Sequence, residues 1–367
     1  MAAARRRRRR EEIVDALLVC EEDDSDLDML LTDTFSTGRN LENTPVNLDQ
    51  FSDDECFEFF RFAKPDLTRL HDGLSLPEKI VGYNGTADTS MEALLILLRR
   101  LAYPNRWCDL VTFFQRDEPE LSIIFNTIVE HIYEEFGHLL TSLNLVWLDL
   151  VTFAEAVHNK GATLDNCWGF IDGTARSISR PTSGQGVVFS GHKRTHCLKF
   201  QSIQAPNGLI AHMFGPIEGS RHDAFMLGES EVLPKLEQLQ NDGPMMCVYA
   251  DPAYPLRPGL MGPFKGAHLT PQQQIFNRSM SEVRVCVEWG FAKIITLFAF
   301  LDFKKNQKLY LQPVAMYFLV ATILTNCHTC LYGSETSTFL ICSHQHLKCI
   351  FQMNKYCKNL FVSTSEK

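Results

Sequence analysis

The chain has 367 residues, which is enough for two domains of ordinary size and for a core that needs no disulfide or metal staple. Hydrophobic residues make up 45% and charged residues 22%, which excludes wholesale disorder, and the longest apolar run, residues 314–324, is too short to span a bilayer. The net charge of −9 does not exclude a polyanionic substrate, because residues 160–333 hold 16 Lys and Arg against 12 Asp and Glu.

The N-terminal segment, residues 1–48, joins a run of six arginines to acidic and then polar sequence. We expect a disordered tail here, because such a composition buries too little apolar surface to fold. The run from Arg5 to Arg10 is typical of a nuclear-import signal or of a phosphate-binding arm, and a low-complexity terminus without either role is the alternative. We therefore expect the protein in the nucleus, with the cytoplasm as a second location.

The next segment, residues 49–160, has a helical period, since apolar residues return every three or four positions between helix breakers. The predicted helices cover residues 53–63, 90–102, 106–114 and 119–140. The short breaks between the last three are typical of a helix-turn-helix, and an ordinary helical bundle has the same pattern. The segment is predicted to be an all-α, helix-turn-helix-like domain.

Residues 161–335 begin with short β-rich runs and continue with long helical ones. The expected strands cover residues 167–171, 196–204, 209–214 and 245–250, with a helix from Asp223 and a long helix over residues 279–298. A tight turn is expected at residues 205–208. This order predicts an α/β domain with a mixed sheet and flanking helices.

Acidic residues follow two of these strands. The apolar runs at residues 167–171 and 245–250 each stop at an aspartate, Asp172 or Asp251. Ligands of open α/β sheets bind outside the carboxyl ends of the strands. If the two strands are parallel neighbours, Asp172 and Asp251 lie side by side, and Asp223 returns to the same edge after the hairpin.

A fourth acid comes from the late helix. Glu288 lies at the margin of the apolar stripe of this helix, one turn after Arg284, which can pair with it. Clustered carboxylates repel one another unless a cation neutralises them, and hard oxygen ligands select Mg²⁺ or Mn²⁺. Two such ions can clamp the attacking and leaving oxygens of a phosphoryl displacement.

Each acid also has a structural interpretation. Asp223 follows Ser220 at the spacing of a capping box, and Glu288 is a possible surface partner of Arg284. Asp172 precedes a glycine and Asp251 precedes a proline, as turn residues do. Taken together, two strand-end aspartates followed by a helical glutamate favour a metal site.

Five stretches form a linked series: FIDGTARSISRP, SGHKRTHCLKFQSIQAPNGLIAHMFGPIEGSRHDAFML, VYADPAYP, VRVCVEWGFAKI and LTNCHTCLYG. With this series, residues 74–333 resemble the PIF/Harbinger-type DDE transposase superfamily, including the nucleases domesticated from it. The resemblance implies an RNase H-like fold with an acidic triad at Asp172, Asp251 and Glu288, and with Asp223 as an additional metal ligand. Residues 336–367 do not share the resemblance and are expected to form a divergent C-terminal tail.

The function implied by this resemblance is a Mg²⁺- or Mn²⁺-dependent DNA endonuclease that hydrolyses phosphodiesters by a DDE two-metal mechanism. DNA is the expected partner, with Lys193, Arg194 and Arg221 as candidate phosphate contacts. The resemblance also implies a separate Myb-like DNA-binding protein, and self-association is a further expectation. The alternative is a catalytically silent, domesticated scaffold that binds DNA or a protein without cutting, and a phosphatase acting on small esters would need a closed pocket.

Overall fold

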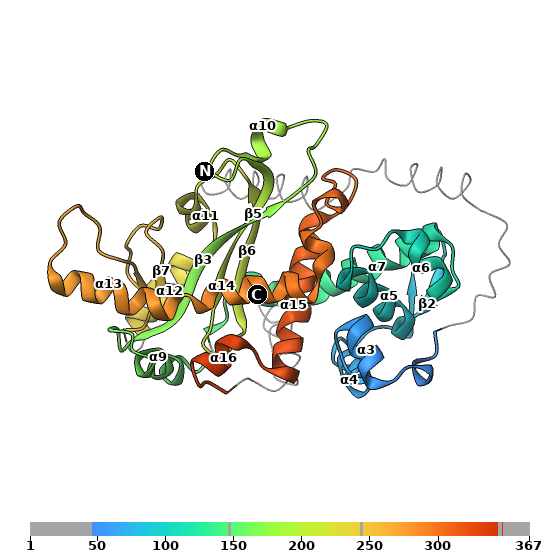
Figure 1. Cartoon of the computed structure of the whole chain (residues 1–367), viewed down its shortest axis with the longest axis horizontal. Coiled ribbons are helices and arrows are strands. Elements are labelled where there is room, and N and C mark those ends of the chain that lie inside the picture. The colour runs from blue at the N-terminus through green and yellow to red at the C-terminus, as the bar shows by residue number, and fades with distance from the viewer. Residues whose placement is uncertain (1–45, 146–147, 243–244, 344–346, 348–367) are drawn as a thin grey trace, which may run out of the picture. The chain divides into compact units, whose positions relative to one another are not determined.

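The computed structural model describes residues 46–145, 148–242, 245–343 and residue 347, and these form two compact units (Figure 1). The first unit contains described residues up to Glu135 together with Ser177–Gln185 and Ile295–Ala321, and the second contains the others. Nearly all of the predicted N-terminal tail, and of the C-terminal tail beyond Ser343, lies outside the described residues. The predicted domain limits at residues 48, 160 and 335 stay predictions.

The first unit consists mainly of helices: α3 (Asp53–Phe60), α4 (Lys64–Gly73), α5 (Ser90–Ala102), α6 (Trp107–Phe114) and α7 (Glu118–Phe136), with the 3-10 turns η1 (Leu48–Gln50), η3 (Ala299–Asp302) and η4 (Lys304–Asn306). A capping box between Ser52 and Glu55 begins α3. Helix α5 is buried on nearly every side, including its polar residues Glu92 and Arg100, and is the most completely buried of these helices. The run of apolar residues from Ala93 to Leu98 packs on all sides of the helix, which places α5 in the core of its unit.

Two short strands separate α4 from α5, where the sequence pattern had predicted only helices. Strand β1 (Lys79–Val81) pairs antiparallel with β2 (Ala87–Thr89). The turn between them contains Asn84 and Gly85, and Gly85 has a φ of +86°. Asn-Gly is a strong hairpin signal because the turn needs positive φ, but three-residue strands are too short to show an alternating pattern.

The second unit contains the predicted mixed sheet. Its strands are β3 (Cys167–Ser177), β4 (Phe189–Ser190), β5 (Thr195–Gln204), β6 (Ile210–Glu218), β7 (Cys247–Ala250) and β8 (Leu260–Met261). The order is β4-β5-β3-β7-β8, with β6 paired to β5. Strands β5 and β6 are antiparallel and β7 is parallel to both β3 and β8. The expected turn is present, with Gly208 at a φ of +83° donating its N–H to the Ala205 carbonyl at 3.0 Å.

Helices flank this sheet: α8 (His138–Thr141), α9 (Leu150–Asn159), α10 (Gln185–Val188), α11 (Asp223–Glu229), α12 (Val232–Asp242), α13 (Pro271–Arg284), α14 (Cys286–Leu297) and α16 (Glu335–Phe339). The long helix predicted over residues 279–298 is two helices, α13 and α14, which run nearly in line (Figure 1). Its apolar stripe is confirmed, since Met280, Val283 and Val287 are buried in the same core cluster as Trp168 and Val248.

Helix α15 (Val314–Tyr332) is longer than the apolar run seen in the sequence. By length and composition alone it is able to cross a membrane, but 89% of its most apolar window is buried inside the protein. The core helix of a soluble protein has the same features, so α15 is weak evidence for a membrane span.

Candidate active site

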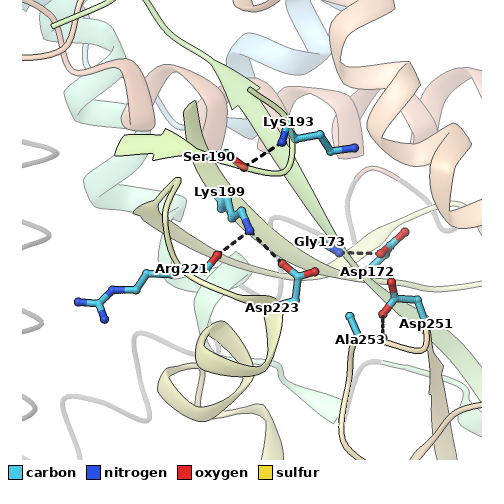
Figure 2. A network of polar contacts seen from close by, with 9 residues as sticks. All are labelled: Asp172, Gly173, Ser190, Lys193, Lys199, Arg221, Asp223, Asp251 and Ala253. Atoms are coloured by element: carbon cyan, nitrogen blue, oxygen red, sulfur yellow. Dashed lines mark hydrogen bonds and ion pairs between the residues drawn. The ribbon is translucent and has the colours of Figure 1, made fainter. Parts of the chain in front are cut away.

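Strands β3 and β7 bring Asp172 and Asp251 together. Ile171 is in register with Ala250 in the parallel pair, so the next residue of each chain segment is an aspartate, and Figure 2 shows the two carboxyl groups close together. Asp251 ends β7 because the following proline has no N–H for the ladder. Strand β3, in contrast, continues to Ser177, so Asp172 lies within a strand and not at its end as predicted. It occupies the point where β3 continues past β7 and its residues change from buried to half-buried.

Asp223 reaches the same place from α11. A Cβ atom on Gly173 would lie 3.3 Å from Asp223 Oδ1 and 3.2 Å from Met226 Cε, so the glycine permits a close approach of α11 to β3. Lys199 of β5 fixes this approach, because its Nζ lies 3.5 Å from Asp223 Oδ1 and donates to the Arg221 carbonyl at 2.6 Å (Figure 2). The capping-box interpretation of Asp223 is wrong, since the N-cap of α11 is His222 and no side chain caps it.

The environment of Asp172 disfavours its charged form. Burial raises the pKa of Asp172 to about 6, and the carboxylates of Asp251 and Glu288 act in the same direction. The guanidinium of Arg284, whose Nη2 lies 3.4 Å from Asp172 Oδ2, and the N–H of Gly173, which donates to Oδ1 at 2.8 Å, partly oppose this shift in pKa. Arg284 therefore neutralises only part of the negative charge of the several carboxylates at this edge.

Glu288 is the most exposed of the four predicted acids. It is exposed in the first turn of α14, and it acts on Asp172 only through its charge. The expected pair between Arg284 and Glu288 does not form among the described residues, because Arg284 turns to the more buried Asp172. Within the described part of the chain, no three His, Cys, Asp or Glu side chains are grouped closely enough to hold a metal ion.

The donor chemistry of this edge fits a hard divalent cation. Asp172 and Asp251 offer carboxylate oxygens side by side, and Asp223 approaches Gly173, the residue after Asp172. Oxygen-only donors select Mg²⁺ or Mn²⁺ over softer metals, and added positive charge offsets both the burial that raises the pKa of Asp172 and the smaller contribution of the neighbouring carboxylates. The site therefore fits a divalent cation in two respects, the oxygen chemistry of its donors and the adjacency of Asp172 and Asp251.

Tyr254 is a residue of the site that the sequence analysis missed. Its side chain is 2% exposed, and its hydroxyl has no hydrogen-bond partner among the described residues. Burial raises the pKa of Tyr254 well above its ordinary value, and the carboxylates of Asp223, Asp172 and Asp251 add to the rise, so the hydroxyl near these acids keeps its proton. The available signal was the tight turn that follows Asp251, in which the Tyr254 N–H donates to the Asp251 carbonyl at 3.2 Å.

The predicted phosphate contacts lie on the surface of the same unit. Lys193 and Arg194 are exposed in the loop between β4 and β5, and Arg194 has a φ of +51°. Arg221 is exposed just before α11, where its Nε lies 3.5 Å from Glu218 Oε2. Figure 2 shows the side chains of Lys193 and Arg221 extending in different directions from their elements.

Comparison with known proteins identifies the segment that carries these acids. Residues 171–326 match the profile of the family described as DDE superfamily endonuclease, which supports a DDE transposase-like family for this chain. The match contains Asp172, Asp223, Asp251 and Glu288. No curated protein and no solved structure matches the chain.

Proposed function

We propose that the chain is a divalent-metal-dependent DNA endonuclease of PIF/Harbinger transposase descent. The observation that carries the proposal is the adjacency of Asp172 and Asp251 on parallel strands, within the residues that match the DDE endonuclease family. The sheet supports an RNase H-like fold, since the first strand, β3, has the antiparallel β5–β6 hairpin on one side and the parallel β7 on the other. The helices of residues 53–136 support a preceding helical domain.

In this proposal Asp172 and Asp251 hold the metal, with Glu288 and Asp223 as further ligands. A bound divalent cation lowers the pKa of water and neutralises charge on a scissile phosphate. Arg284 orients the Asp172 carboxylate from 3.4 Å. Lys199 holds Asp223 at the start of α11.

The neutral hydroxyl of Tyr254 is able to donate to an oxygen at this edge, since it has no other hydrogen-bond partner among the described residues. Lys193, Arg194 and Arg221 are exposed and bind the phosphates of the DNA strand in this proposal. The proposal also includes a nuclear location through Arg5 to Arg10, a separate Myb-like DNA-binding partner and self-association.

The test is nicking of supercoiled plasmid by the purified chain in Mg²⁺, Mn²⁺ or EDTA, with Asp251→Asn as the variant. Asp251 is the better target because its Oδ1 accepts the Ala253 N–H at 2.9 Å, a bond that the amide oxygen of asparagine keeps. Asp172 is a poorer target, since its second oxygen pairs with Arg284. We expect metal-dependent nicking in the wild type and a loss of at least about 1,000-fold in Asp251→Asn, as for catalytic groups that act as a unit.

Asp165→Asn is the matched control, because Asp165 is an exposed aspartate two residues before β3. It makes the same change of charge outside the site, and its nicking rate should equal that of the wild type. Equal nicking by wild type and Asp251→Asn would contradict the assignment of the site.

A silent scaffold is the second candidate function. It is favoured by the exposure of Glu288 and by the lack of a three-ligand group within the described residues. Calorimetry with Mn²⁺ separates the two functions, since the endonuclease should bind Mn²⁺ in a way that depends on Asp251. Absence of both nicking and Asp251-dependent binding would establish the scaffold.

A further inference from the structure

Two exposed phenylalanines of the second unit each have a cationic or imidazole side chain against the ring. Phe225 of α11 is 37% exposed, and the Cζ atom of Arg221 lies 4.6 Å from the centre of its ring. Phe189 of β4 is 40% exposed, and its ring centre lies 5.3 Å from that of His196 in an edge-on arrangement. Large apolar rings left in solvent beside basic groups are a feature of binding surfaces and not of a core.

These two pairs lie on adjoining segments. The Ser220 N–H, next to Arg221, donates to the Val187 carbonyl at 3.2 Å, and Val187 is itself 51% exposed two residues before Phe189. Gly219 lies directly against the backbone of Val188, where a side chain on the glycine would collide. We call Val187, Phe189, His196, Arg221 and Phe225 the aromatic–basic patch.

The patch adjoins the carboxylate edge. Asp223 and Phe225 both belong to the first turn of α11, and because residues two apart leave a helix about 200° from each other, the acid and the ring lie on opposite sides of this turn. The side chain of Lys199, which contacts Asp223, is held in place because its ammonium also donates to the Arg221 carbonyl. A DNA strand that leaves the carboxylates around the first turn of α11 would reach these rings.

The charge around the patch also suits a nucleic acid. His192, Lys193 and Arg194 are exposed in the loop between β4 and β5, and His222 is exposed beside Arg221. The adjacent acid, Glu218, is already paired with Arg221. Lys and Arg side chains are sufficient to bind phosphates. The exposed rings therefore indicate a second kind of contact, with a part of the ligand other than its phosphates.

Exposed aromatic rings recognise bases that are free to stack. Paired bases of a duplex present only their edges in the grooves, whereas an unpaired base offers a flat face to a ring. A polyanion is favoured over a protein partner by the exposed loop of His192, Lys193 and Arg194 beside Phe189 and His196, since lysine is depleted at protein interfaces. The ligand that matches both the rings and the cations is a DNA strand with unpaired bases.

We propose that the aromatic–basic patch binds unpaired nucleobases of the DNA strand beside the cleavage site, with Phe225 as the main stacking ring. This inference rests on the proposed nuclease function for the identity of the polymer. It goes further in assigning a site for bases that have left the duplex.

The test is equilibrium binding in EDTA, by fluorescence anisotropy at constant salt, so that no strand is cut. Two single-stranded oligonucleotides of equal length and charge are compared, one with all its bases and one with abasic residues at its centre. The wild type should bind the base-bearing strand about tenfold more tightly, as stacking of one or two bases predicts. This ratio should fall to nearly one in Phe225→Ala.

Three further variants make the result specific. Phe225→Trp keeps a ring and should restore the tenfold ratio, whereas Phe225→Leu keeps apolar area without a ring and should not. Phe303→Ala is the matched control, since Phe303 is 42% exposed and belongs to the first unit, and its ratio should equal that of the wild type. Because Phe225 is a partly exposed residue, these changes leave the core of the unit in place.

An unchanged ratio in Phe225→Ala overturns the proposal, as does a wild type that binds both strands equally. Failure of the nuclease is a different result, because plasmid nicking would be absent while the base-dependent ratio persisted. Failure of the stacking site alone would leave Asp251-dependent nicking in place and remove only the ratio.

Discussion

Each compact unit contains a group of acids beside one arginine. The two groups differ in how many of the acids form an ion pair with that arginine. In the first unit Arg116 lies 2.9 Å from Asp88 and 3.5 Å from Glu92, and the side chains of both acids are no more than 2% exposed. In the second unit Arg284 lies 3.4 Å from Asp172, whose side chain is 17% exposed, and it forms no ion pair with the other acids. The first group is closed inside the protein, and the second is open to a ligand.

A raised pKa does not by itself distinguish the two groups. Burial raises the pKa of Glu92 to about 7 and that of Asp172 to about 6, and a neighbouring carboxylate contributes in both cases. Perturbed acids mark functional sites only when they also reach a ligand. Openness and the family match, and not the shift in pKa, therefore assign the site to the second unit.

The largest effect on stability should come from Arg116→Ala. Removal of the arginine leaves Asp88 and Glu92 buried without their cation, and breaking a buried ion pair in this way costs about 3 to 5 kcal/mol. The measurement is urea denaturation at pH 8, above the pKa of about 7 that Glu92 has in the folded chain.

The matched variant for this comparison is Arg284→Ala. Its partner Asp172 is more exposed, so solvent replaces much of the lost interaction and the expected cost is about 1 kcal/mol or less. Equal losses in the two variants would show that the two groups do not differ as the structure indicates.

The second effect is a pH dependence of stability in the first unit. Because the folded pKa of Glu92 is about 7 and its ordinary value is 4.5, the folded chain holds a proton that the unfolded chain releases. This contribution to stability is full below about pH 4.5 and is lost as the pH rises to about 7, a change of about 3 kcal/mol.

Glu92→Gln isolates this effect, since glutamine has nearly the same shape and does not titrate. The free energy of unfolding, measured from pH 5 to pH 8, should vary less in the variant by about 2.5 kcal/mol. Asp88, whose pKa burial also raises, accounts for a remaining slope of the same sign. Parallel pH profiles for the two proteins would contradict the buried position of the Glu92 charge.

The smallest effect on stability should come from Tyr254→Phe, in the open group. The hydroxyl lacks a hydrogen-bond partner among the described residues, so its removal should leave the free energy of unfolding unchanged or raise it by about 1 kcal/mol. Nicking should nevertheless fall about tenfold or more, because the open edge loses a protonated donor beside Asp172, Asp223 and Asp251.

Tyr249→Phe is the control, since Tyr249 is a buried tyrosine of β7 whose hydroxyl also has no partner among the described residues. Its change in stability should be similar, and its nicking rate should stay near that of the wild type. A fall in nicking of equal size in both variants would assign the effect of Tyr254 to packing.

The sequence predicted the second unit more closely than the details of its site. The turn at residues 205–208 and the apolar stripe of the late helices follow from local patterns, and the structure confirms them. The parallel pairing of the two apolar strands, which the sequence posed only as a condition, is present. The prediction that the first strand ends at Asp172 was wrong, because the apolar run stops there while β3 continues to Ser177. The β1–β2 pair was missed because its strands are only three residues long.

The sequence by itself determined which acids exist and that two of them follow apolar runs, since alternation and apolar runs are local properties of the chain. Only the tertiary structure decided which residues surround these acids. Arg284 pairs with Asp172 across 112 positions of sequence, Gly173 makes room for Asp223, and Tyr254 is buried near the acids while Glu288 stays exposed. Such contacts join segments that are distant in the chain, and no local period encodes them, because each depends on how whole strands and helices pack.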